Sequence, residues 1–447
     1  MDEKKSYILN PFFHKDYPVI SYGEGIYLYT EEGRQIIDGS SGSVLISLGH
    51  GQKTMGDVLK AQADKVTFAY RWDCITKVLE KASECVCEAS NFNFNKVFYV
   101  CGGSEAVEIG MKLARRYFIN IGKTSKYKLI ARHQCYHGST MGAMSITEFP
   151  ARRAGYEDYL IEMGHIPPAY CYRCWYGKEP GTCARECAKA LEDEILRQGP
   201  DTVAAFILEP VSGMSLCGAH GDIEYYKEIR RICDKYDVLL MADEVMCGVG
   251  RTGSMYAHQQ LGFVPDILML GKAVSGGYFP VGAVLCNDKI YDGIDQNTGE
   301  FPPGYSWAGN PLGAAVVCEN FRILKEQNLI SKVSDKGKYL KSKLVDMALK
   351  HKIVGDVRGL GLMIGLEFVK DKNTRECFDP KLKVAGMISK AVLEENMFVE
   401  TSTGCNHGES GDMAMIAPAY IVTYEEMDEI VARLDRAIYK VEKQLGL

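Results

Sequence analysis

The chain has 447 residues, of which 46% are hydrophobic and 25% are charged, and its formal net charge is −6. This length and composition are those of a soluble globular protein with room for one large and one smaller domain. The weakly acidic balance, with no basic block, argues against binding to nucleic acid or to an anionic membrane.

Targeting signals and cysteine usage suggest the compartment. No apolar run approaches the roughly 20 residues needed to cross a bilayer, and the start, MDEKKSYILNPFF, lacks the apolar core of a secretion signal. We therefore expect a cytoplasmic protein. Most of the 16 cysteines stand singly in apolar segments, so in a reducing cytosol we expect small core residues rather than disulfides.

The N-terminal part predicts strands and a possible anion site. Residues 22–38 have the alternation and turn residues of a β-meander. A strand is expected at 96–101 and leads into Gly102, Gly103 and Ser104. The helix after this turn carries apolar residues at helical spacing, namely Val107, Met111, Ala114 and Phe118. Because N–H groups and the helix dipole converge at a helix N-terminus, the turn could bind an anion, although the motif alone is weak.

Two further strand signals follow. The stretch 128–140, KLIARHQCYHGST, predicts a strand that ends at Tyr136 and His137. An aromatic ring there could stack on a flat ligand or pack in the core, and the sequence leaves both open. Residues 203–211, VAAFILEPV, predict a buried strand that ends in Glu209. Alternating strands and helices from about 96 to 287 predict a mostly parallel sheet with helices on both sides.

A cysteine-rich segment lies between these strands. Its spacing is C-x2-C-x8-C-x3-C, formed by Cys171, Cys174, Cys183 and Cys187. Such spacing suits a structural zinc ion, and it equally suits four reduced thiols on an insertion loop and helix. We favour the thiols. A metal here would stabilise a loop and would take no part in catalysis.

The stretch 238–274 carries the strongest chemical signal. Two apolar runs, Val238–Met241 and Ile267–Leu270, have the length and composition of strands buried on both faces. Asp243 and Glu244 follow the first run, and Lys272 follows the second. An acid and an amine are therefore expected where the carboxyl ends of parallel strands gather ligands.

Two interpretations of this lysine and aspartate are open. For the pair taken alone, a surface ion pair is the better interpretation. A buried lysine, however, loses its charge readily, and a neutral lysine near an aspartate is what pyridoxal phosphate (PLP) chemistry requires. The lysine forms the Schiff base, and the aspartate keeps the ring nitrogen protonated.

The surrounding motifs favour the second interpretation. LEP at 208–210, ADEV at 242–245, GVGRTG at 248–253, PDI at 265–267 and GKAVSGG at 271–277 stand in order over some seventy residues. This stretch resembles the signature of the class III (ω-) aminotransferases, a branch of the fold-type-I PLP enzymes.

The resemblance implies an α/β protein of the PLP-transferase fold type I. Its large PLP-binding domain, with a mostly parallel sheet between helices, would span residues 61–320. A small α+β domain would combine an N-terminal part, residues 1–60, with a C-terminal part, residues 321–447. Thr423 and Glu426 form a capping box that predicts the last helix.

The resemblance also implies roles for individual residues. Lys272 would carry PLP with Asp243 at the ring nitrogen, and Tyr136 and Val245 would lie on opposite ring faces. Ser306 stands where relatives have a threonine that reaches the phosphate in the neighbouring subunit, which implies a homodimer with shared active sites. The complete set of implied cofactor-binding residues is Gly103, Ser104, Tyr136, His137, Glu209, Asp243, Val245, Lys272 and Ser306.

The implied reaction moves an amino group from an amine, an ω-amino acid or a related donor to a 2-keto acid such as pyruvate or 2-oxoglutarate. Racemisation, an aminomutase shift or decarboxylation on the same scaffold stays an alternative, because motifs around the cofactor do not separate these reactions. A binding protein without catalysis is disfavoured, because the lysine, the aspartate and the phosphate turn are all retained.

The substrate is less defined. Many relatives hold a carboxylate through an arginine near the C-terminal segment, and residues 404–420 contain none. Arg71, Arg153 and Arg358 are alternative candidates, and Val44 stands where bulkier residues often line the substrate entrance.

Overall fold

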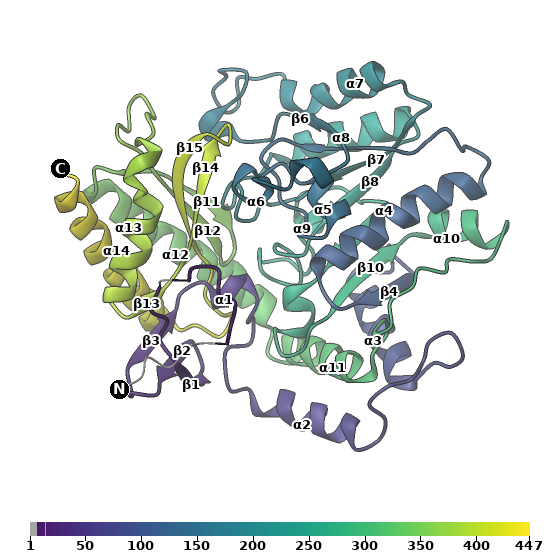
Figure 1. Cartoon of the computed structure of the whole chain (residues 1–447), viewed down its shortest axis with the longest axis horizontal. Coiled ribbons are helices and arrows are strands. Elements are labelled where there is room, and N and C mark those ends of the chain that lie inside the picture. Colours follow the sequence, from purple (N-terminus) through teal and green to yellow (C-terminus); the bar gives the residue numbers. More distant parts are fainter. Residues whose placement is uncertain (1–6, 14) are drawn as a thin grey trace.

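The computed structural model describes residues 7–13 and 15–447. Figure 1 shows a larger lobe and a smaller lobe that holds both ends of the described chain. The larger lobe is built around a seven-stranded sheet. Within this part of the chain, no helix is both long and apolar enough to cross a membrane.

The large sheet has one reversed strand. Strand β10 (Gly282–Cys286) is antiparallel to its neighbours β4 (Lys96–Val100) and β9 (Ile267–Leu270), and all other neighbouring pairs are parallel. The mostly parallel sheet expected from the sequence is therefore confirmed. In spatial order the strands are β4 (Lys96–Val100), β10 (Gly282–Cys286), β9 (Ile267–Leu270), β8 (Leu239–Asp243), β7 (Val203–Leu208), β5 (Lys128–Arg132) and β6 (Gly164–Ile166).

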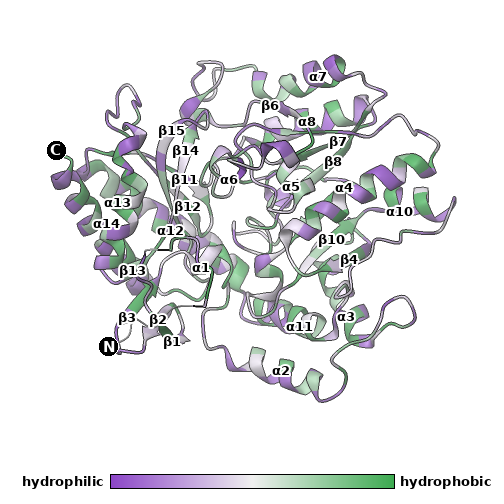
Figure 2. Ribbon diagram, in the orientation of Figure 1, coloured by the Kyte–Doolittle hydropathy of each residue, from purple (hydrophilic) through white to green (hydrophobic). Residues whose placement is uncertain are grey.

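Side chains of the central strands pack on both faces of this sheet. Along β8, Leu239 and Met241 join a core cluster that includes residues of helix α4 (Gly103–Asn120). Leu240 and Ala242 point the other way, into a cluster that includes residues of α8 (Ile223–Lys235). Because successive residues of a strand face opposite sides, a strand covered on both faces must be apolar throughout. Figure 2 shows the accompanying alternation of hydrophilic and hydrophobic residues along α4.

One strand is shorter than predicted. We expected it to continue to Tyr136 and His137, but β5 ends at Arg132. Gln134 has left-handed backbone geometry (φ +54°), and its N–H donates to Glu148 Oε2 at 2.7 Å. The chain therefore turns away from the sheet before the two aromatic side chains.

The smaller lobe contains two four-stranded sheets. In the first, β3 (Gln35–Asp38) pairs in parallel with β13 (Met397–Phe398), so that N-terminal and C-terminal segments share one sheet. Its strands are β1 (Ile20–Glu24), β2 (Tyr27–Thr30), β3 (Gln35–Asp38) and β13 (Met397–Phe398). The second is antiparallel, with the order β11 (Val354–Leu360), β12 (Met363–Phe368), β15 (Ser410–Ile416) and β14 (Glu400–Asn406).

The remaining elements are helical. Helices α2 (Lys53–Ala63) and α11 (Pro311–Glu326) run across the expected domain boundaries at residues 60 and 320, which stay predictions. The predicted capping box opens α14 (Tyr424–Gln444). The other α-helices are α1 (Ser41–Val44), α3 (Lys77–Ala89), α5 (Met141–Ile146), α6 (Pro150–Arg153), α7 (Glu186–Gln198), α9 (Ala257–Gln260), α10 (Asp288–Asp295), α12 (Leu329–Lys350) and α13 (Val384–Glu394). Single 3₁₀ turns are η1 (Glu157–Tyr159), η2 (Cys171–Arg173), η3 (Lys272–Ser275) and η4 (Pro380–Leu382).

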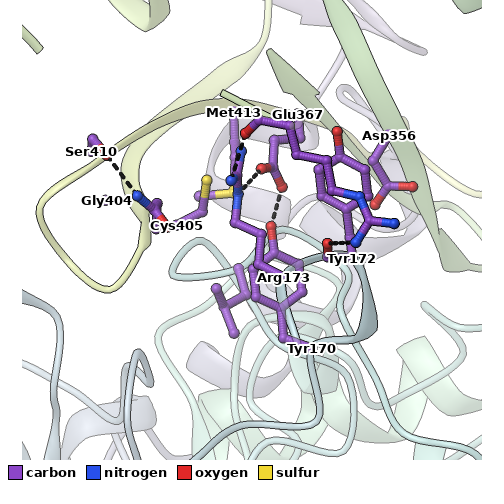
Figure 3. Close-up of polar contacts among 12 residues, drawn as sticks. Tyr170, Tyr172, Arg173, Asp356, Glu367, Gly404, Cys405, Ser410 and Met413 are labelled. Atoms are coloured by element: carbon purple, nitrogen blue, oxygen red, sulfur yellow. Dashed lines mark hydrogen bonds and ion pairs between the residues drawn. The ribbon is translucent and has the colours of Figure 1, made fainter. Parts of the chain in front are cut away.

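A buried ionic network ties the start of the cysteine-rich segment to the smaller lobe. Glu367 on β12 has no exposed surface, and its Oε1 accepts from Arg173 Nε at 2.6 Å. Its Oε2 accepts from Arg358 Nη1 at 2.7 Å and from the hydroxyl of Tyr170. Figure 3 shows Tyr170 and Arg173 converging on Glu367. Although burial opposes ionisation, Arg358 and Arg173 hold the pKa of Glu367 below its usual range.

We predict that Glu367→Ala destabilises the protein by about 3 kcal/mol or more, because it leaves two arginines partly uncompensated in the interior. Urea denaturation would measure the loss. Glu376→Gln is the matched control, since Glu376 pairs with Lys370 while both side chains are more than half exposed, and it should cost less than about 1 kcal/mol. Equal effects of the two substitutions would contradict a structural role for the network.

Candidate active site

Three ionisable side chains meet at one edge of the large sheet. Glu209 follows β7, Asp243 ends β8, and Lys272 stands two residues after β9. These strands are parallel neighbours, so their carboxyl ends lie at the same edge. All three residues line a cavity of about 270 Å³.

Lys272 occupies an unusual backbone position. It has a φ of +44°, follows Gly271, and its Nζ donates to the backbone oxygen of Ser43 at 2.6 Å. Burial lowers the pKa of Lys272 to about 8, although Glu400 and Asp243 act in the opposite direction. A substantial fraction of this amine is therefore neutral, and nucleophilic, near physiological pH.

Asp243 is fixed by two hydrogen bonds. Its Oδ2 lies 2.8 Å from Nδ1 of His137, and its Oδ1 accepts from the N–H of Val245 at 3.1 Å. His137 is itself held by a hydrogen bond from its N–H to Thr147 Oγ1 at 2.8 Å. Burial disfavours a charged imidazole, yet Cys135 and the hydrogen-bonded Asp243 together raise the pKa of His137 to about 10.

The N-terminus of α4 forms another part of the cavity wall. Gly103 begins this helix, and a Cβ on it would lie 2.5 Å from Val245 Cγ1, so only glycine fits against this valine. Ser104 Oγ accepts from the N–H of Ser139 at 3.0 Å. Gly138, with φ +145°, packs so close that a Cβ would lie 2.6 Å from Ser104 Oγ. The first N–H groups of a helix lack intrahelical partners, so this surface favours an anion.

Tyr136 and Glu209 complete the predicted set within the cavity. The Tyr136 hydroxyl lies 2.8 Å from Ser139 Oγ. The rings of Tyr136 and Phe149 meet edge to face, with their centroids 6.3 Å apart. Glu209 accepts from the N–H of Gly213 at 3.0 Å and from the N–H of Tyr136 at 3.4 Å. Burial raises the pKa of Glu209 above its usual range.

Other predicted residues lie outside the cavity. Arg71 Nη2 donates to Pro303 O at 3.0 Å, and Arg153 Nη1 donates to Thr147 O at 3.0 Å. Arg358 is engaged by Glu367 in the buried network. Val44 is fully buried beside the cavity-lining Ser43, and Ser306 is exposed on the loop before α11.

Sequence reasoning missed two charged residues of the cavity wall, Arg152 and Glu400. Arg152 belongs to the one-turn helix α6. The side chain of its neighbour Arg153 donates instead to the backbone oxygen of Thr147. Glu400 is the first residue of β14, whose pairing with β15 brings it to the cavity. Neither belongs to a local motif, and only the absence of an arginine in the C-terminal segment hinted at an altered substrate site.

The zinc hypothesis for the four-cysteine segment is not supported. A tetrathiolate site needs four sulfur atoms around one point at about 2.3 Å. Across the described residues, no group of three or more His, Cys, Asp or Glu side chains is placed to hold a metal. Cys171, Cys174, Cys183 and Cys187 are free thiols, and Cys187 is the second residue of α7 while the others lie before this helix.

The fold and the charged groups at the carboxyl edge of its sheet place the protein among the fold-type-I α/β transferases. Residues 13–438 match the family model of the class III aminotransferases, and the chain belongs to this family. The protein is thus an enzyme that transfers an amino group from a donor to a keto acid.

Individual relatives and solved structures agree with this assignment. An uncharacterized aminotransferase of Schizosaccharomyces pombe is 36% identical over 98% of this chain and 95% of its own length. A diaminobutyrate–2-oxoglutarate transaminase of Halomonas elongata is 36% identical over 98% of this chain and 94% of its own. A PLP-bound amine transaminase from an uncultivated Pseudomonas species superposes with a TM-score of 0.91 at 28% identity, covering 98% and 99% of the two chains.

We predict that Lys272 of the cofactor-free protein reacts with cyanate at pH 7 far faster than an ordinary lysine. With a pKa of about 8, about one tenth of its amine is neutral at pH 7, against roughly 0.03% for an unperturbed lysine. Peptide mapping by mass spectrometry would follow the reaction, with Lys53 as an exposed comparison. Modification of Lys272 at or below the rate of Lys53 would contradict the lowered pKa.

Proposed function

We propose that the cavity binds PLP and that Lys272 and Asp243 carry out the amino transfer with it. The observation that carries this proposal is that a lysine of lowered pKa and a hydrogen-bonded aspartate face one cavity from neighbouring strand ends. The residues suit the cofactor. Gly103 and Ser104 at the start of α4 would receive the phosphate, and Tyr136 and Val245 would enclose the ring.

Each side chain has a defined task in this proposal. Bound PLP supplies the electron sink for the substrate carbon. Asp243, fixed by its hydrogen bonds with His137 and Val245, holds a proton at the ring nitrogen. The neutral amine of Lys272 attaches the cofactor and, once released by the donor, moves the proton between the two carbons that exchange the amino group. Glu209 accepts from the N–H groups of Tyr136 and Gly213 and so links the two loops that carry them.

The acceptor is a 2-keto acid, whose carboxylate requires a cation. Of the arginines in the described residues, Arg152 lines the cavity, whereas Arg71, Arg153 and Arg358 lie outside it with other partners. We therefore assign Arg152 to the acceptor carboxylate. Pyruvate and 2-oxoglutarate are the acceptors to test first.

We predict that Lys272→Ala abolishes turnover, since both attachment of the cofactor and the proton shuttle are lost. Borohydride reduction of the wild-type holoenzyme, followed by peptide mapping, should mark Lys272. Cofactor found on any other lysine refutes the assignment.

We predict that Asp243→Asn lowers kcat by roughly two orders of magnitude or more while the fold is kept, because an unprotonated ring nitrogen is a poor electron sink. Asp266→Asn is the matched control. Asp266 is equally buried, but it does not line the cavity. Its Oδ2 pairs with Nη1 of Arg230 at a distance of 2.8 Å. The control should lose stability and keep its activity. Were Asp243 only a structural partner of His137, the two variants would behave alike.

A homodimer is the second part of the proposal. Large apolar side chains are exposed on two neighbouring loops, at Phe68, Tyr70, Trp72, Ile75 and Trp307. The loops touch through Phe68 and Trp307, whose ring centroids lie 5.9 Å apart. Such a patch is typical of a subunit interface, and Ser306 adjoins it. Ser306 is therefore well placed to reach the phosphate in a second copy of the chain.

We predict that Lys272→Ala and Ser306→Asp complement each other when the two inactive variants are unfolded together and refolded. The aspartate repels the phosphate across the interface. A mixed dimer has one site with both residues intact, so about one quarter of the wild-type activity should return from random pairing. Each variant refolded alone is the control. If mixing restores nothing although dimers form, Ser306 does not serve the partner's site.

We also propose that the protein is cytoplasmic. All 16 cysteines are free thiols, which is expected of a protein kept in a reducing cytoplasm.

A further inference from the structure

Glu400 is the one acid of the cavity wall whose carboxylate is left without a complete set of partners within the described residues. Its Oε2 is buried and makes no hydrogen bond. Its backbone N–H donates to Ser40 Oγ at 2.8 Å, which fixes the start of β14. The residue is thus positioned by the backbone while a side-chain oxygen has nothing to bind.

The other cavity acids differ from Glu400. Asp243 receives hydrogen bonds from His137 and Val245, and Glu209 receives them from the backbone. Lys272 is attracted electrostatically by Glu400. Its amine nevertheless donates to Ser43 O rather than to this carboxylate. A carboxylate oxygen buried without a partner is costly, so a ligand that supplies hydrogen-bond donors would bind there favourably.

We infer that Glu400 selects amino donors that carry a second ammonium group, such as diamines. This inference rests on the proposed function and names its donor class. The reacting amine would face Lys272 while the distant ammonium donates to the free oxygen of Glu400, a charge-assisted hydrogen bond. A donor with a carboxylate at that end would instead meet like charge in a partly buried site.

The cavity wall offers a different charged residue to each of the two substrates. Glu400 offers a negative charge from β14 of the smaller lobe, and Arg152 offers a positive charge from α6. A donor with a distal ammonium would therefore engage Glu400, and the keto acid that follows it would engage Arg152. The two half-reactions thus need no residue that binds both kinds of charge.

The test compares three donors of equal length with the wild-type holoenzyme: 1,4-diaminobutane, butylamine and 4-aminobutanoate. The chain length that fits best would be fixed beforehand with diamines of three to five carbons. We expect kcat/KM to fall in the order diamine, monoamine, amino acid. Glu400→Gln should lower kcat/KM for the diamine by roughly 10- to 100-fold and leave butylamine within a few-fold. Glu400→Arg should reverse the order of diamine and amino acid.

Glu409→Gln is the matched control, because it removes the same charge from the exposed tip of the same β14–β15 hairpin and should not alter the order of donors. Retained PLP absorbance and thermal stability would show that each variant is folded. The comparison of the three donors uses only the wild-type enzyme, so it tests recognition of the second ammonium even if a variant fails to fold.

Three results would overturn the inference. A wild type that uses butylamine as well as the diamine rules out recognition of a second ammonium and leaves the aminotransferase intact. An equal loss for all donors in Glu400→Gln would mean that Glu400 acts through Lys272. PLP-loaded wild type that transfers no amino group from any donor would defeat the proposed function, and the inference with it.

Discussion

The structure depends on three neighbouring parallel strands that are buried on both faces. Strands β7, β8 and β9 can carry polar groups only where they end, because every side chain along them contacts one of the two cores. Their shared direction brings those ends to one edge of the sheet. Glu209, Asp243 and Lys272 therefore meet in one cavity although the first and the last of them are 63 positions apart in the sequence. The energy of core packing holds the charged groups together.

Much of this fold was predictable from local patterns, because strands covered on both faces have continuous apolar runs and the helices between them have periodic ones. The errors have local physical causes. The strand after Lys128 stops early because Gln134 adopts left-handed backbone geometry, which its residue type does not announce. The expected domain boundaries at residues 60 and 320 fall within α2 and α11 and stay predictions.

Some residues of the candidate site were predictable from local motifs, and others were not. Gly103, Tyr136, Asp243 and Lys272 stand in local motifs, and the structure brings them to one cavity. Arg152 could not be told from Arg153, because the choice depends on which side chain bonds to the oxygen of Thr147. Glu400 depends on strand pairing far along the chain. The cysteine spacing was compatible with a metal, but spacing does not fix where the sulfur atoms lie.

The location of Glu400 affects how this enzyme can diverge. Asp243 and Lys272, the proposed reacting groups, stand at strand ends of the large sheet, whereas Glu400 begins β14 in a separate antiparallel sheet. In the inferred mode of donor recognition, a substitution at that strand start changes the charge of the cavity wall without disturbing the packing that holds the lysine. New donor preferences can therefore arise by mutation in one lobe while the reaction chemistry is inherited unchanged in the other.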